Sequence, residues 1–147
     1  MAAIIIPVHT EEQLNHGLDI RKEVFVEEQK VPVDLEIDGF DVIGPDSHHV
    51  LIELDGRYAA TGRITYYKDN AAKIQRVAVR KEFRSHGIGR VLMLALEQMA
   101  RDLGFEKAVL DGQCQAEGFY RRLGYKVISD EPFYDAGILH VRMEKKL

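Results

Sequence analysis

The sequence predicts a single α/β domain built on a mixed sheet, mostly antiparallel, with one central parallel pair of strands. Residues 73–110 have the order strand, glycine loop, helix, strand. This order is a βαβ unit, in which the crossover is right-handed and the two strands are parallel. Asp55-Gly56 stands between two strand-like runs and is a two-residue hairpin turn, which predicts antiparallel neighbours. At 147 residues the chain has the length of one domain, residues 1–147, with a core of its own.

The composition is that of an ordinary globular protein, with 46% hydrophobic and 30% charged residues. A single cysteine excludes an internal disulfide framework and fits a reducing cytoplasm. Residues 1–8 are apolar but too short, and lack the basic leader, for a signal peptide or a membrane span. We therefore expect a cytoplasmic protein with no membrane partner. An isoelectric point near 5.9, with no basic stripe, argues against nucleic-acid binding.

The first third of the chain predicts a strand, a helix and a loop. Residues 4–6 are three isoleucines and favour a short strand. Thr10-Glu11-Glu12-Gln13 is a capping-box signature, and we expect its helix to run to about Glu28. Pro32 ends the helical run, because proline disfavours helix at the residue before it. Residues 33–47 are acidic and contain two glycines and a proline, so they are expected to form a loop.

Three strands are expected next, over residues 48–54, 57–67 and 74–79, with a turn at residues 68–70. His48 and His49 begin the first of them. Successive strand residues point to opposite faces of a sheet, and no third ligand stands at metal-binding spacing. We therefore expect no metal site.

The loop at residues 84–89, Arg-Ser-His-Gly-Ile-Gly, stands at a helix start. The first N–H groups of a helix lack internal partners, and the helix dipole adds positive charge there. Glycines let a ligand approach the backbone closely, so the loop favours an anion such as a phosphate or pyrophosphate. It is not a Walker A loop, because no Lys-Ser/Thr follows the glycines. The alternative is a tight loop whose glycines only permit unusual backbone angles.

The rest of the chain predicts a helix over residues 90–103, closed by Gly104, and then a buried strand at 108–110. Residues 111–115 are expected to form a turn. A short helix follows that contains Phe119 and Tyr120 and ends at Gly124. Two further segments, 125–128 and 139–143, are expected to complete the sheet as an antiparallel pair.

Two motifs in this region resemble the GNAT superfamily of N-acetyltransferases. Arg-x-x-Gly-x-Gly at residues 84–89, after a valine-rich strand, resembles the acetyl-CoA loop of that superfamily. Residues 116–125, Ala-Glu-Gly-Phe-Tyr-Arg-Arg-Leu-Gly-Tyr, are similar to its Ala-x-x-Phe-Tyr-x-x-x-Gly-Phe segment. The motifs stand in the expected order, and together they span residues 73–127. Residues 23–29 and 135–140 further resemble a little-characterised bacterial branch of the superfamily.

The resemblance implies a GNAT-like domain whose central parallel strands splay apart to admit the pantetheine arm of acetyl-CoA, with helices flanking the sheet. It also implies that acetyl-CoA is a co-substrate and that no metal is used. The residues implied to bind the co-substrate lie on the strand, the loop and the short helix: Val77, Ala78, Val79, Arg84, Ser85, His86, Gly87, Ile88, Gly89, Arg90, Phe119 and Arg122. Phe119 is also a candidate for the core, and Arg122 for a solvated helix cation.

The resemblance further implies acetyl transfer to a primary amine of a small molecule or peptide, by direct attack on the thioester. Tyr120, at the motif position of the family's tyrosine, is the candidate acid that protonates the leaving sulfur. Its alternative is a half-buried packing aromatic. Gln75 occupies the region where some members carry a glutamate base, and an amide cannot serve as a base. The candidates for the base are then Glu27, Glu28, Glu36, Asp38 and His140, each of which is also a candidate surface residue, or a chain of water molecules. Nothing pairs Cys114 with a histidine at motif spacing, so an acyl-cysteine is not favoured.

Charge is distributed unevenly along the chain. Residues 1–50 carry 11 acidic and 3 basic residues, whereas residues 51–147 carry 13 and 17. In a transferase the basic part would face CoA phosphates and the acidic part a cationic amine, which makes Glu28, Glu36 and Asp38 candidate substrate-binding residues. A solvated acidic surface would give the same distribution of charge. The sequence is also compatible with a non-catalytic acyl-CoA-binding or sensing domain, and with assembly as a homodimer.

Overall fold

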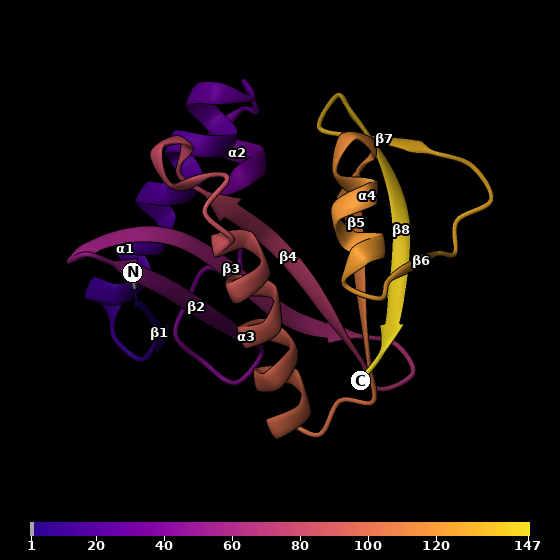
Figure 1. Cartoon of the computed structure of the whole chain (residues 1–147), viewed down its shortest axis with the longest axis horizontal. Coiled ribbons are helices and arrows are strands. Elements are labelled where there is room, and N and C mark those ends of the chain that lie inside the picture. The colour runs from indigo at the N-terminus through magenta and orange to yellow at the C-terminus, as the bar shows by residue number, and fades with distance from the viewer. Residues whose placement is uncertain (1) are drawn as a thin grey trace.

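The computed structural model describes residues 2–147 and consists of a twisted sheet with helices on both faces (Figure 1). Within these residues the sheet has eight strands. The elements in chain order are β1 (Ala3–Pro7), α1 (Glu11–Arg21), the π-helical η1 (Lys22–Glu28), α2 (Val33–Glu36), β2 (Ser47–Leu54), β3 (Arg57–Tyr67), β4 (Ala71–Val79), the 3₁₀ turn η2 (Lys81–Phe83), α3 (Ile88–Asp102), β5 (Lys107–Gln113), the 3₁₀ turn η3 (Cys114–Ala116), α4 (Glu117–Arg122), β6 (Lys126–Val127), β7 (Phe133–Asp135) and β8 (Ile138–Lys146).

The strand order is β1-β2-β3-β4-β5-β8-β6, with β7 paired to β8. Only β4 and β5 are parallel, and every other pair among the described residues is antiparallel. This arrangement confirms the predicted fold class. The parallel pairing covers four positions, from Ala71 opposite Lys107 to Ile74 opposite Leu110. Beyond Ile74 the two strands diverge, and Figure 1 shows the V-shaped opening between them.

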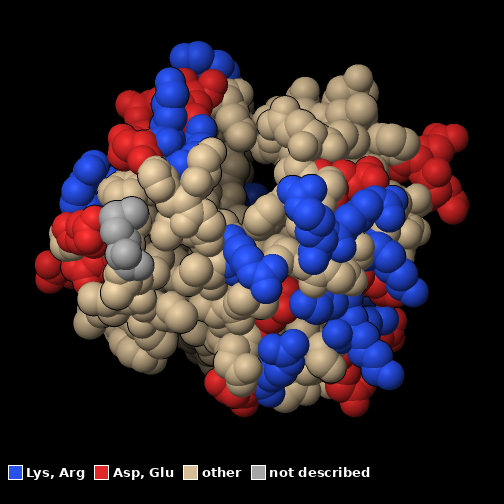
Figure 2. Space-filling view, viewed as in Figure 1, with Lys and Arg blue, Asp and Glu red and all other residues tan. Residues whose placement is uncertain are grey.

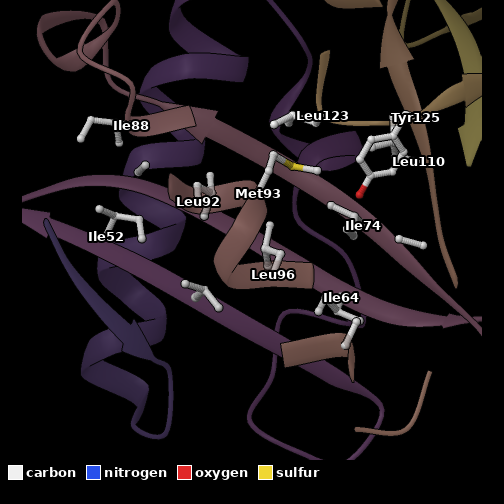
Figure 3. Close-up of a cluster of buried hydrophobic side chains, with 14 of the residues drawn as sticks. Ile52, Ile64, Ile74, Ile88, Leu92, Met93, Leu96, Leu110, Leu123 and Tyr125 are labelled. Carbon is white, nitrogen blue, oxygen red and sulfur yellow. The ribbon is translucent and has the colours of Figure 1, made fainter. Parts of the chain in front are cut away.

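Helix α3 covers one face of the sheet because its apolar residues recur every four positions. Ile88, Leu92, Leu96 and Ala100 form one buried stripe at this spacing, as expected for residues on one side of an α-helix. Figure 3 shows this stripe packed on isoleucines of β2, β3 and β4. Gly62 of β3 allows the close contact, because a Cβ there would lie 2.6 Å from Cδ1 of Leu96.

Helix α1 and η1 cover the opposite face. Alternation along β2 separates the two cores: Val50 and Ile52 point into the cluster below α3, whereas Leu51 packs with Ile20 and Val24. Thr10 and the side chain of Gln13 form the predicted capping box at the start of α1. The helical run continues as η1 to Glu28, which confirms its predicted extent.

Three local predictions need correction. Residues 33–47 do not form an entirely irregular loop, because Val33–Glu36 form one helical turn. Residues 111–113 are not a turn: they extend β5, and their partners are residues 140–142 of β8. The local sequence contains turn formers, but a ladder with a strand far along the chain satisfies their backbone groups instead. The hairpin strand β7 was also not predicted.

A buried ion pair fixes α3 against the C-terminal strands. Glu97 of α3 has no exposed surface, and it accepts hydrogen bonds from the Tyr125 hydroxyl at 2.9 Å and from Lys145 Nζ at 2.8 Å. Burial, together with the adjacent Glu97 charge, raises the pKa of Tyr125, so the phenol stays a neutral donor. Glu97 therefore connects α3 to the residue that precedes β6 and to β8.

Candidate active site

A cavity of about 640 Å³ lies where β4 and β5 diverge. Figure 2 shows the molecular surface hollowed at this place, with Lys and Arg side chains gathered on the half that contains α4. The lining comes from both faces of the sheet. Gly89 and Tyr120 reach the cavity from the α3 and α4 side, whereas Glu36, Lys73 and Gln75 reach it from the α1 side. The cavity therefore passes through the sheet, between the separated strands.

A β-bulge shapes the β4 wall of this cavity. Thr61 of β3 pairs with Ala78 and Arg63 pairs with Gln75, so two residues of β4 stand opposite the single residue between them. Arg76 in the bulge has φ of +58°, a left-handed conformation that is uncommon for a residue with a side chain. Since β5 has already diverged, the outer edge of β4 beyond residue 74 presents backbone groups to the cavity instead of to a strand.

The start of α3 forms a second wall. Gly87 is the N-cap with φ of +76°, and no side chain caps the first turn, so its N–H groups and the helix dipole favour an anion. Gly89 lies against α4, because a Cβ there would be 3.3 Å from Phe119 Cζ. Arg84 is held at the rim by two contacts: its Nε donates to the Val79 carbonyl at 2.9 Å, and its guanidinium pairs with Glu28 at 2.9 Å.

Tyr120 projects into the cavity from α4. Its ring lies on Gly112 of β5, where a Cβ would meet two ring carbons at 3.0 Å, and it makes edge contacts with Phe119 and Tyr125. Burial raises the pKa of Tyr120 to about 12. The side chain is therefore a neutral hydroxyl at physiological pH, able to donate a hydrogen bond or proton.

The acidic segment is neutralised by arginines. Asp41 pairs with Arg21 and, at 3.0 Å, with Arg63. Asp38 pairs with Arg63 at 2.7 Å and with Arg76 at 3.3 Å. Three arginines thus share three carboxylates. Four of the six side chains are buried, whereas Asp38 and Arg76 are partly exposed. We name this set the arginine–carboxylate cluster: Arg21, Arg63, Arg76, Glu36, Asp38 and Asp41.

The pKa values in the arginine–carboxylate cluster reflect a balance of burial and pairing. Burial opposes ionisation of Asp41, but hydrogen bonds and charge from Arg21 and Arg63 outweigh it and hold its pKa at about 2. For Glu36, burial dominates and raises the pKa despite Arg76 and Arg21. His49 packs beside the cluster, where burial and the Arg63 charge lower its pKa.

All residues that line the cavity lie within the part of the chain that one protein-family model matches. The family model described as "Acetyltransferase (GNAT) domain" matches residues 6–147. The chain belongs to the GNAT acetyltransferase family.

Relatives of this GNAT protein match it along nearly its whole length. It is 40% identical over 145 residues to an uncharacterised N-acetyltransferase, YjcF, of Bacillus subtilis, in an alignment that covers 99% of each chain. Its structure is similar to that of an acyl-CoA N-acyltransferase from Pseudomonas aeruginosa, with a TM-score of 0.86, 30% identity and 98% and 99% coverage. A candidate N-acetyltransferase from Lactobacillus plantarum gives a TM-score of 0.91 at 30% identity, with 100% and 99% coverage. The protein is therefore an acyltransferase by family, and GNAT enzymes use acyl-CoA substrates.

The residues proposed from the sequence lie in four environments. Those that line the cavity are Val77, Ala78, Val79, Arg84, Gly89, Phe119, Tyr120 and Glu36. Those that are exposed on the loop, the first turn of α3 or α4 are Ser85, His86, Gly87, Arg90 and Arg122. Ile88 points into the core. Glu28 and Asp38 are paired with Arg84 and Arg63 and do not contribute to the lining.

The sequence did not predict a set of polar side chains on β4 and β5 that lines the cavity. Asp111 of β5 accepts hydrogen bonds from Lys73 Nζ at 3.0 Å and from Arg142 Nε at 2.8 Å. Gln113 Nε2 donates to Gln29 Oε1 at 2.9 Å and links η1 to β5. No motif marks these residues, because strand pairing alone brings them together. Among residues 2–147, no group of three His, Cys, Asp or Glu side chains is placed to hold a metal, and no helix is long and apolar enough to cross a membrane.

Proposed function

We propose that this protein is an acetyl-CoA-dependent N-acetyltransferase that acetylates a primary amine of a small molecule or peptide. The observation that carries the proposal is the cavity through the sheet, where the β4 bulge, the uncapped start of α3 and Tyr120 meet. The thioester would enter from the α3 and α4 side. The amine would approach from the α1 side, where polar side chains line the cavity.

The co-substrate fits the chemistry of these walls. The backbone of Val77 to Val79 lacks a strand partner on the cavity side and is available to pair with the pantetheine amides. The first turn of α3 supplies N–H groups for the pyrophosphate. Arg90 of α3 and Arg122 of α4 are exposed and would add positive charge for the phosphates.

The reaction proceeds by direct attack of a neutral amine on the thioester carbonyl. Tyr120 donates a hydrogen bond and then a proton to the departing sulfur. A phenol of pKa about 12 is a weaker acid than a thiol of pKa ~8.5, so a complete transfer alone is uphill by roughly 5 kcal/mol. The proton that leaves the amine nitrogen must therefore replace the phenol proton as the sulfur departs. The Tyr120 oxygen thus carries no full charge.

For acceptor binding, Glu36 is the strongest of the three carboxylates proposed from the sequence, because it lines the cavity. Its partners Arg21 and Arg76 offset its charge. Neutralising this carboxylate would therefore affect folding as well as acceptor use, and the two effects have to be measured separately.

The second candidate function is acyl-CoA binding without catalysis. Gln75 favours it, because its Oε1 accepts hydrogen bonds from Arg63 at 2.9 Å and from Thr65 at 3.3 Å, and an amide supplies no base. Thiol release from acetyl-CoA, measured across a panel of amines, separates the two functions. A transferase releases thiol in proportion to acetylated amine. A protein whose melting temperature rises with CoA, but which releases no thiol with any amine, would be a sensor.

A further inference from the structure

Among the described residues that line the cavity, His140 of β8 is a titratable side chain that makes no ion pair. His140 stands opposite Gln113 of β5, and the neighbouring residues Val141 and Gly112 also pair. Successive strand residues point to opposite faces, and Tyr120 lies on the Gly112 face. His140 therefore lies on the face opposite Tyr120, one residue further along the same strands, and both side chains line the cavity.

The backbone sets the tautomer of His140. Its Nδ1 lies 2.6 Å from the carbonyl oxygen of Ile138. A carbonyl oxygen only accepts hydrogen bonds, so Nδ1 must carry the hydrogen, and in the neutral ring Nε2 has a lone pair. The ring of Phe133 stacks on the imidazole, with centroids 6.1 Å apart and an interplanar angle of 23°. Two contacts thus fix the ring with a basic nitrogen available.

Two carboxylates that line the cavity, Asp111 and Glu36, are held by cations. Burial opposes the ionisation of Asp111 on β5, but the hydrogen bonds and charges of Arg142 and Lys73 outweigh it and lower its pKa. Glu36 is paired with two arginines. The charged groups on the elements around the imidazole include Asp111 on β5, Arg142 on β8, Lys73 on β4 and Asp135 on β7. The same strands also carry Lys107, Arg76, Glu144, Lys145 and Lys146. Lys73 and Arg142 both pair with Asp111, whereas Asp135 is exposed at the rim and has no ion pair among residues 2–147.

We propose that His140 is the catalytic base that takes a proton from the acceptor ammonium; this rests on the proposed function. The ammonium transfers one proton to Nε2 and leaves an imidazolium and a neutral amine. The nitrogen lone pair forms the new C–N bond, and the C–S bond breaks with its electron pair on sulfur. The sulfur takes the Tyr120 proton, and the second proton of the amine nitrogen returns to the Tyr120 oxygen. The imidazolium then releases its proton to water.

The first test needs no acceptor. Long-range ¹H–¹⁵N spectra of histidine-labelled protein report the tautomer of each neutral ring, and His140→Gln assigns the signal. We expect the His140 signals of an Nδ1–H ring. An Nε2–H ring would leave no lone pair toward the cavity and would overturn the assignment of the base.

The second test separates proton removal from packing. We expect His140→Gln to lower kcat/KM by ~10²–10⁴-fold with alkylamines, and to leave the KM for acetyl-CoA unchanged. With a weakly basic acceptor that is already neutral at pH 7, such as an aniline, the loss should largely disappear. The control His9→Gln changes an exposed histidine outside the cavity and should match wild type with both acceptors.

The outcomes separate this inference from the function on which it rests. Equal losses with both classes of acceptor, or no loss with either, would overturn the role of His140 in an enzyme that remains an acetyltransferase. A wild-type protein that releases no thiol with any amine would overturn the proposed function, and the catalytic role of His140 with it.

Discussion

Replacing Asp41 with asparagine removes a charge from the centre of the arginine–carboxylate cluster while keeping the size of the side chain. The Asp41 side chain is 2% exposed and bonds to two arginines, whose side chains are 3% and 1% exposed. Its pKa falls from 3.8 to about 2 in the folded protein, which corresponds to roughly 2 kcal/mol of stability at neutral pH. Removing one partner of a buried pair costs ~3–5 kcal/mol when the remaining charge is uncompensated. Other carboxylates stay in place, so we expect a loss of about 2–4 kcal/mol.

Thermal unfolding at pH 7 measures this effect, and we expect Asp41→Asn to unfold roughly 5–15 °C below wild type. Because the folded pKa lies below the unfolded one, the stabilisation is present above about pH 4 and is lost as the pH falls through about 2. The difference in unfolding free energy between the two proteins should therefore narrow between pH 7 and pH 3. Asp34→Asn makes the same charge change at an exposed residue of the same segment and should stay near wild type. If Asp41→Asn and Asp34→Asn have the same unfolding temperature, the arginine–carboxylate cluster does not stabilise the fold.

Three further predictions test the other parts of the site and fold. Tyr120→Phe should lower kcat by ~10²–10⁴-fold and keep CoA affinity, and a near-wild-type kcat with chemistry rate-limiting would remove the phenol from the mechanism. Gly87→Val should abolish the rise in melting temperature that CoA produces. Gly56 has the same φ of +76° in a distant turn, so Gly56→Val should destabilise the protein but keep that rise. Equal responses of the two variants to CoA would exclude the loop before α3 as the phosphate site. Glu97→Gln should lower the free energy of unfolding, measured in urea, by ~1–3 kcal/mol. Glu144→Gln changes a partly exposed carboxylate and should lower it by less than ~1 kcal/mol, so equal losses would show that the buried Glu97 charge does not stabilise the fold.

The sequence predicted those features that local chemistry determines. The capping box at Thr10, the hairpin at Asp55-Gly56 and the helix after Gly87 each depend on residues a few positions apart, and each is found. The arginine–carboxylate cluster depends on contacts between residues 15 to 40 positions apart, so a count of charges by segment could not show that three of the carboxylates are paired with arginines. Arg76 at the bulge gave no signal either, because glycine is the residue expected at a positive φ. The lining of the acceptor side likewise became visible only through strand pairing.

The passage through the sheet has a consequence for enzyme kinetics. Because the two proposed substrates reach the same centre from opposite faces, neither has to leave before the other arrives. Acetyl-CoA and amine can occupy the protein together, and initial-velocity plots against one substrate at fixed levels of the other should intersect rather than run parallel. Free CoA would compete with acetyl-CoA but not with the amine. The divergence of two strands after a four-residue ladder would thus allow both proposed substrates to be bound at the same time.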